Sequence, residues 1–63
     1  MNYTKQQAQH VAALASANTK HPHNVYTLTN GESYVALPEG AYVSHEYAVW
    51  ICEYRDGQMV RAR

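Results

Sequence analysis

Several kinds of residue are scarce in this chain of 63 residues, and each shortage excludes a class of protein. A single cysteine excludes a disulfide framework within the chain and a zinc site built from several cysteines. No run approaches the roughly 18 apolar residues that are needed to span a bilayer. The N-terminal residues lack the apolar block of a signal peptide, so we expect a cytoplasmic location.

Net charge is also missing, because five Lys and Arg residues are balanced by five Asp and Glu residues. Domains that bind nucleic acid mainly through phosphates usually carry a basic excess. The charges are nevertheless separated along the chain. Residues 21–54 contain four glutamates and neither Lys nor Arg, whereas residues 55–63 carry a net charge of +2. Such a separation can steer a charged partner, and it also arises by chance on a solvated surface.

Residues 4–17 are predicted to form an N-terminal helix. Thr4 and Gln7 fit a capping box, in which each side chain bonds the backbone N–H of the other residue. An apolar stripe follows at helical spacing, formed by Ala8, Val11, Ala12 and Ala15 with Leu14 beside it. Because most of these side chains are small, we expect the helix to lie close to the surface that it covers. Asn18 is expected to end the helix in a left-handed conformation.

Asn30 and Gly31 predict a tight hairpin turn between two β-rich segments, residues 25–29 and 32–37. A two-residue turn at this point places Tyr26 opposite Val35 and Thr27 opposite Tyr34. One face of the hairpin then carries four apolar side chains: Tyr26, Leu28, Val35 and Leu37. The other face carries Thr27, Thr29, Glu32 and Tyr34. This separation of apolar from polar side chains supports the register.

Residues 45–55 are compatible with two structures. A strand is favoured by the β-forming residues 49–52 and by Asp56 and Gly57, which predict a second two-residue turn into a strand over residues 58–62. A helix is favoured by the spacing of Tyr47, Trp50, Ile51 and Tyr54. The strand predicts an α+β fold, with the N-terminal helix packed on a small antiparallel sheet of two β-hairpins in one domain, residues 1–63. The helix predicts an α-β-β-α arrangement.

The second hairpin generates a candidate binding face. Its predicted register gives three pairs: Tyr54–Met59, Cys52–Arg61 and Trp50–Arg63. We expect one face to pack beneath the helix, with Val49, Ile51, Val60 and Ala62. The other face displays the candidate binding residues Trp50, Tyr54, Met59, Arg61 and Arg63, and Tyr34 extends it from the first hairpin. These residue types are enriched at protein interfaces. The alternative is that Trp50 belongs to the core, because the chain has one Trp and no Phe.

The histidines and the cysteine match no standard catalytic or metal-binding pattern. His21 and His23 flank Pro22, and together with His45 and Cys52 they do not have the spacing of a zinc site. The three glycines are isolated, so they do not form a phosphate-binding loop. We therefore expect no enzyme, no catalytic residues, no metal ion and no cofactor.

The predicted function is that of a non-catalytic protein-binding module, which acts by occupying a surface on a partner protein. Accessory and inhibitory proteins, such as those from mobile elements, are often of this size and composition. The alternative is a small protein that binds single-stranded nucleic acid by stacking bases on the aromatic and arginine face. A homodimer is also expected, because a marginal core gains from burial against a second copy. No membrane partner is expected.

Overall fold

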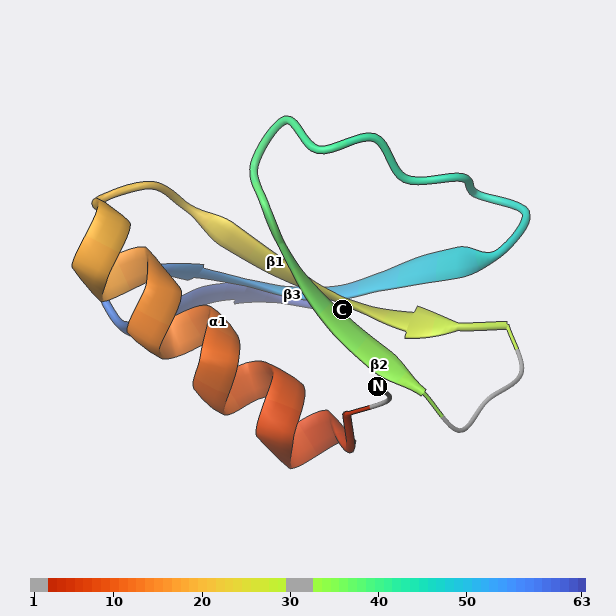
Figure 1. Ribbon diagram of the computed structural model, residues 1–63, viewed down its shortest axis with the longest axis horizontal. Helices are drawn as coiled ribbons and strands as arrows, with labels where there is room; N and C mark the ends of the chain where they lie inside the picture. The colour runs from red at the N-terminus through yellow and green to blue at the C-terminus, as the bar shows by residue number, and fades with distance from the viewer. Residues whose placement is uncertain (1–2, 30–32) are drawn as a thin grey trace.

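The computed structural model describes residues 3–29 and 33–63, which form a helix and a four-stranded antiparallel sheet. The helix α1 spans Lys5–Thr19, and the strands are β1 (His23–Leu28), β2 (Tyr34–Pro38), β3 (Ala48–Arg55) and β4 (Gln58–Ala62). The strand order is β2-β1-β3-β4, and α1 lies on one side of the sheet (Figure 1). The predicted α+β fold, a helix on two β-hairpins, is confirmed.

The predicted capping box begins α1. The Gln7 N–H donates to Thr4 Oγ1 over 3.1 Å, and the Thr4 N–H donates to the Gln7 side-chain oxygen over 2.9 Å. The predicted end at Asn18 is wrong, because the left-handed residue is Lys20, with φ of 63°. The Thr19 hydroxyl donates to the Ala15 carbonyl over 2.8 Å, which ties the last turn to the helix. Among the described residues, no helix is long and apolar enough to cross a membrane.

The buried face of α1 consists of small side chains, as expected. Ala8, Ala12 and Ser16 are fully buried, whereas Leu14 is 52% exposed on the outer side of the helix. Ala8 and Ala12 form the core with Val25 of β1 and Cys52 of β3. Partly buried side chains pack around this core: Tyr3, Tyr34, Ala36, Ile51 and Tyr54. The small residues let the helix approach the sheet closely, so the core has little room for additional volume.

Residues 48–55 form a strand, and the alternative of a helix over residues 45–55 is wrong. The strand β3 pairs with β1 on one side and β4 on the other, so both neighbours satisfy its backbone. The predicted turn between β3 and β4 is confirmed: Arg55 pairs with Gln58, and Asp56 and Gly57 have φ of 51° and 84°. The positive φ favours glycine at position 57, and an added Cβ there would lie 3.5 Å from the Ala17 Cβ.

The predicted register of the first hairpin is confirmed. Tyr26 pairs with Val35, and Thr27 pairs with Tyr34. The Leu28 N–H donates to the Ser33 carbonyl over 2.9 Å, which continues the pairing toward the turn. The Asn30–Gly31 turn itself and Glu32 lie outside the described residues.

The helix packs on the face of this hairpin opposite to the one that is most apolar in sequence. Val25, Tyr34 and Ala36 belong to the core or pack against it. The predicted apolar set lies on the other face and is partly buried: Tyr26, Leu28, Val35 and Leu37. Because β1 lies between β2 and β3, residues 39–47 must run the length of β1 to connect them. This segment arches on the side of the strands opposite to α1 (Figure 1).

The fully buried helix positions predict a strong asymmetry in tolerance to volume. Ala12→Leu adds apolar volume at a position with 0% exposure, so we expect the free energy of unfolding to fall by about 1–3 kcal/mol. Leu14→Ala, on the exposed side of the same helix, should change it by less than about 0.5 kcal/mol. Urea denaturation followed by circular dichroism measures both. Equal stability of wild type and Ala12→Leu would contradict close packing of α1 on the sheet.

Candidate protein-binding surface

A β-bulge in β3 decides which of its side chains lie under the helix. Val25 pairs with Cys52, but the next residue of β1, Tyr26, pairs with Trp50. Ile51 is therefore an extra residue, and the alternation of side chains shifts by one position beyond it. As a result Cys52 lies under the helix with Val25, whereas Trp50 lies with Tyr26 on the face that the helix does not cover.

A second bulge lies in the β3–β4 hairpin. Tyr54 pairs with Met59, as predicted, but Glu53 pairs with Arg61, so Val60 is an extra residue in β4. Because side chains of paired residues share a face, Arg61 lies on the same face as Glu53. Met59 lies on the same face as Tyr54, which packs against the core.

The bulge overturns the predicted register for the rest of this hairpin. Cys52 pairs with Ala62, not with Arg61. The Arg63 N–H donates to the Ile51 carbonyl over 2.7 Å, so Arg63 is not opposite Trp50. A strictly alternating hairpin has no extra residue, and each pair beyond the bulge is displaced by one position relative to that pattern.

Trp50 and Arg61 come together on the helix-free face. The Arg61 guanidinium carbon lies 5.6 Å from the centre of the Trp50 ring, within the range of a cation–π interaction. The Trp50 indole N–H donates to the Asn24 side-chain oxygen over 2.9 Å. Trp50 is partly buried and does not belong to the core cluster beneath α1. Its indole is therefore held in place from two sides on this face.

Glu53 is a buried carboxylate that organises the same face. It is 2% exposed, and both of its oxygens accept bonds from arginines at the surface. The Arg55 Nε donates to Oε2 over 2.6 Å, and the Arg61 Nε donates to Oε1 over 2.7 Å. The bond from Arg55 lowers the pKa of Glu53; burial opposes this effect, and Arg61 adds to it. The ion pairs therefore keep the buried Glu53 charged and hold Arg61 over Trp50.

Tyr54 and Tyr34 do not join the surface on which Trp50 lies. Both pack against the core beneath α1, and burial is the main cause that raises the pKa of Tyr54. The prediction from the sequence put Tyr54 and Trp50 on one face because side chains were expected to alternate without interruption along this strand. The backbone of Tyr34 is also tied to the N-terminal segment, because its N–H donates to the Tyr3 carbonyl over 3.1 Å.

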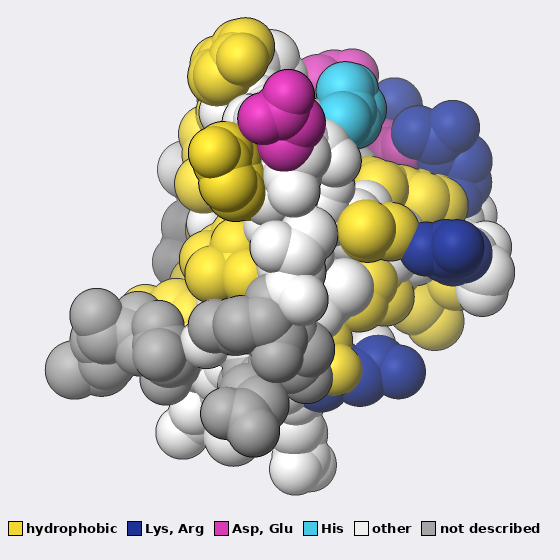
Figure 2. Space-filling view, turned by 90° about the vertical axis from the view of Figure 1, so that its right-hand side faces the viewer, with side chains coloured by type: hydrophobic (Ala, Val, Ile, Leu, Met, Phe, Trp, Pro, Cys, Tyr) yellow, Lys and Arg dark blue, Asp and Glu magenta, His cyan; other side chains and the backbone are white. Residues whose placement is uncertain are grey.

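The exposed candidates gather around β4, an edge strand of the sheet whose five residues are all exposed. Met59 is 53% exposed and Val60 is 48% exposed, and Arg61 lies beside Val60 in the strand. We define the Trp50–β4 surface as Trp50, Met59, Val60, Arg61 and Arg63. Figure 2 shows side chains of Lys and Arg gathered next to hydrophobic side chains on one flank of the molecule.

Glu53 was not singled out from the sequence, but the structure places it at the centre of this face. A signal existed in the chain: Arg55 follows Glu53 at the same-face spacing of a strand, and a basic residue comes shortly after the turn. Nothing in the sequence indicated that Asn24 accepts the hydrogen bond from the indole, because this contact depends on the pairing of β1 with β3.

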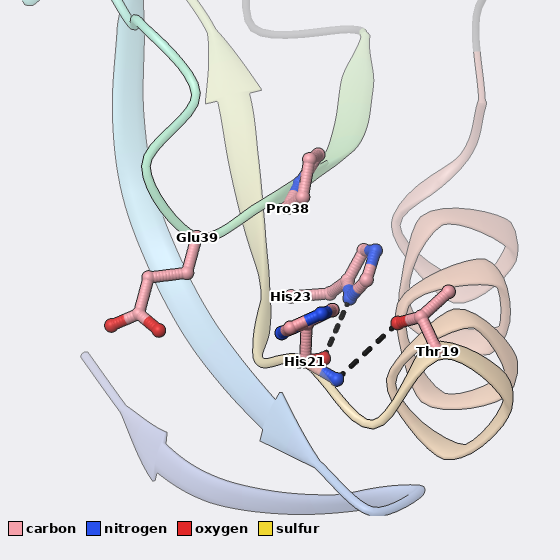
Figure 3. Close-up of a pocket in the computed structure, with 5 residues that line it drawn as sticks. All are labelled: Thr19, His21, His23, Pro38 and Glu39. Carbon is pink, nitrogen blue, oxygen red and sulfur yellow. Dashed lines mark hydrogen bonds between the residues drawn. The ribbon is translucent and has the colours of Figure 1, made fainter.

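His21 and His23 line an open pocket of about 430 Å³ with Thr19, Pro38 and Glu39 (Figure 3). His23 is mostly buried, and its Nδ1 lies 2.9 Å from the His21 carbonyl, so this nitrogen is the donor. The Glu39 carboxylate points away from the two rings (Figure 3). Within residues 3–29 and 33–63, no three potential ligands are grouped so that they could hold a metal ion.

Cys52 is sequestered from solvent. It is 1% exposed within the core, and the Gln9 amide approaches its sulfur to 4.0 Å. Burial is the main cause that raises the pKa of the Cys52 thiol, so the reactive thiolate is disfavoured. This environment is that of a structural cysteine.

Comparison of the chain with models of protein families, with curated proteins and with solved structures found no match. Its own geometry is therefore the basis for assigning a function.

The pKa of Glu53 predicts how stability depends on pH. Because the folded-state pKa is lowered, the ion pairs contribute fully at pH values above about 4.3, where the unfolded glutamate is ionised, and this contribution is lost as the pH falls through the folded-state pKa. Glu53→Gln should lower the free energy of unfolding at neutral pH by about 1–3 kcal/mol and weaken its acid dependence.

Urea denaturation between neutral and acidic pH measures this effect, and Glu46→Gln is the matched control, because Glu46 is exposed. We expect the control to retain the stability and the acid dependence of the wild type. A Glu53→Gln variant as stable as the wild type at neutral pH would contradict a stabilising role for the ion pairs.

The burial of Cys52 predicts a thiol that is protected in the folded state. A thiol-reactive chromophore should label the native protein much more slowly than the protein in denaturant, because both the exposure and the ionisation of the thiol are suppressed. Stopped-flow absorbance measures the two rates. Similar rates in the presence and absence of denaturant would show that Cys52 is accessible.

Proposed function

We propose that the chain is a non-catalytic binding module that occupies a surface on another protein through the Trp50–β4 surface. The observation that carries this proposal is the edge strand β4, whose five residues are all exposed. It includes Met59 and Val60, and its Arg61 lies over the Trp50 ring. Trp, Met and Arg are enriched at protein interfaces, and the strongest contacts usually involve Trp and Arg.

These side chains are already held in place, which favours binding. Arg61 is held by Glu53 and by the Trp50 ring, and the indole is held by Asn24. Side chains that are already fixed lose less conformational entropy when a partner docks. The partner is thus offered a preformed pair of aromatic and cationic groups next to exposed apolar side chains.

The same geometry favours a protein over single-stranded nucleic acid. Arg55 and Arg61 share the single charge of Glu53, so this cluster offers phosphates one net positive charge instead of two. Stacking of several bases needs successive exposed aromatic side chains, but Tyr54 packs against the core instead of lying beside Trp50. An experiment on this surface must therefore distinguish binding of nucleic acid from binding of protein.

A cytoplasmic location fits this role. Cys52 is a free thiol enclosed in the core, which is the usual state of cysteine in a reducing compartment. An accessory or inhibitory protein of this kind acts by blocking a surface of its target and needs no catalytic group of its own.

Two matched truncations test the proposal. Met59→Ala and Leu14→Ala each remove a side chain that is about half exposed, one from the Trp50–β4 surface and one from the outer side of α1. Immobilised wild type and both variants are incubated with nuclease-treated extract of the native host, and retained proteins are identified by mass spectrometry. We expect a protein that wild type and Leu14→Ala retain equally and that Met59→Ala retains about tenfold less.

A third variant, Trp50→Ala, separates binding from folding. Loss of the same protein with an unchanged circular dichroism spectrum supports a direct contact by the indole, whereas unfolding assigns Trp50 a structural role. Equal retention by all variants contradicts the proposed surface. A protein that is retained from untreated extract but not from nuclease-treated extract, or whose binding weakens steeply with salt, indicates nucleic acid instead.

A further inference from the structure

The backbone of β4 has hydrogen-bonding groups directed away from the sheet. The Arg63 N–H points inward, because it donates to the Ile51 carbonyl. Backbone groups alternate in direction along an antiparallel strand, so the N–H and C=O of the preceding residue, Ala62, point outward. Gln58 is paired with Arg55 next to the two-residue turn, so its backbone groups point toward β3. The backbone groups of the following residue, Met59, therefore point outward. The edge of β4 therefore has two positions whose backbone groups face outward and bond to no other residue in the part of the chain that the structure describes.

The opposite edge of the sheet is protected at its two ends. At one end of β2, the Tyr34 N–H donates to the Tyr3 carbonyl, and Tyr3 and Tyr34 form an isolated bridge. At the other end, Pro38 has no backbone N–H. An added strand would find these groups occupied or missing, so β4 is the edge that is better suited to pair with another chain.

The charge on β4 indicates the chemistry of that chain. Arg61 lies in the strand and Arg63 follows it, and both side chains are exposed. The acidic residue nearest to Arg61 is Glu53, which is buried and has both oxygens occupied. An approaching strand therefore meets cationic groups with apolar side chains between them. Acidic side chains on that strand complement this pattern, and opposite charges on neighbouring strands stabilise pairing.

A second copy of this chain is a poorer match for the same edge. If two β4 strands pair antiparallel about Arg61, this residue faces its own copy. If they pair about Ala62, Arg61 faces Arg63. Like charges directly opposite one another destabilise strand pairing. The homodimer expected from the sequence remains a prediction, and in these two registers the charges oppose it.

From these observations we infer that β4 accepts an extended acidic segment of the partner protein as a fifth strand. This inference rests on the proposed function and specifies how the partner binds. Backbone bonds to Ala62 and Met59 supply affinity, and acidic side chains facing Arg61 and Arg63 supply selectivity.

Ala62→Pro tests the backbone contact. Proline removes the outward N–H of Ala62 but no N–H that bonds to β3, and an edge strand tolerates proline at such a position. Ala62→Ser is the control, because it keeps the N–H. The probes are two capped peptides of about eight residues, one alternating glutamate with valine and the other alternating lysine with valine. The fluorescence of Trp50 and the circular dichroism spectrum verify that each variant is folded.

We expect the acidic peptide to bind the wild type and Ala62→Ser, and to bind Ala62→Pro about tenfold more weakly. The lysine peptide should bind more weakly than the acidic one, and Arg63→Glu should reduce this preference. Nuclear magnetic resonance should show that the acidic peptide protects the Met59 and Ala62 amides from exchange. Absence of acidic-peptide binding, or equal binding to folded Ala62→Pro, overturns strand addition.

The capture experiment distinguishes failure of strand addition from failure of the proposed function. A host protein that is lost from Met59→Ala but retained by Ala62→Pro supports binding through the Trp50–β4 surface and rules out strand addition. A protein lost from both variants supports both proposals. Sedimentation of the wild type and of Ala62→Pro tests whether a second copy of the chain occupies this edge. A wild-type dimer that Ala62→Pro abolishes would assign the edge to a second copy.

Discussion

A single extra residue in β3 determines both the core and the surface of this protein. Ile51 interrupts the alternation of side chains between Cys52, which packs against the helix, and Trp50, which lies on the opposite face. Without that interruption, alternation would place the thiol and the indole on the same face of the sheet. The bulge therefore places a small side chain under the closely packed helix and the large ring on the face that the helix leaves uncovered.

On the helix-free face, the side chains of the β3–β4 hairpin are organised by charge, whereas the helix-covered face is organised by apolar packing. Glu53 is buried, and its cost of desolvation is offset by bonds from Arg55 and Arg61. The same bonds fix Arg61 over Trp50. A polar contact on the covered side, from the Gly57 N–H to the Ser16 hydroxyl over 2.9 Å, attaches the β3–β4 turn to the helix. Both contacts restrain the β3–β4 hairpin next to the exposed edge.

The elements that the sequence predicted correctly depend on neighbouring residues. The capping box joins Thr4 to Gln7, and the turn at Asp56 and Gly57 needs a left-handed backbone that glycine adopts readily. The candidate site was predicted less well. Trp50, Met59, Arg61 and Arg63 lie on or beside the exposed edge strand, but Tyr54 and Tyr34 pack against the core. Their orientation depends on pairing between strands, which alternation within one strand does not report.

The sequence by itself determined the N-terminal helix, the register of the first hairpin and a turn at Asp56 and Gly57, because these follow from local backbone preferences and side-chain periodicity. It left residues 45–55 open between a strand and a helix, and pairing with β1 and β4 decided for the strand. The tertiary structure alone decided which face of the first hairpin the helix covers and which residues surround Trp50. The covered face depends on fitting Ala8 and Ala12 closely against the sheet. The surroundings of Trp50 depend on two bulges, because each adds one residue to one strand and is defined only relative to its neighbour.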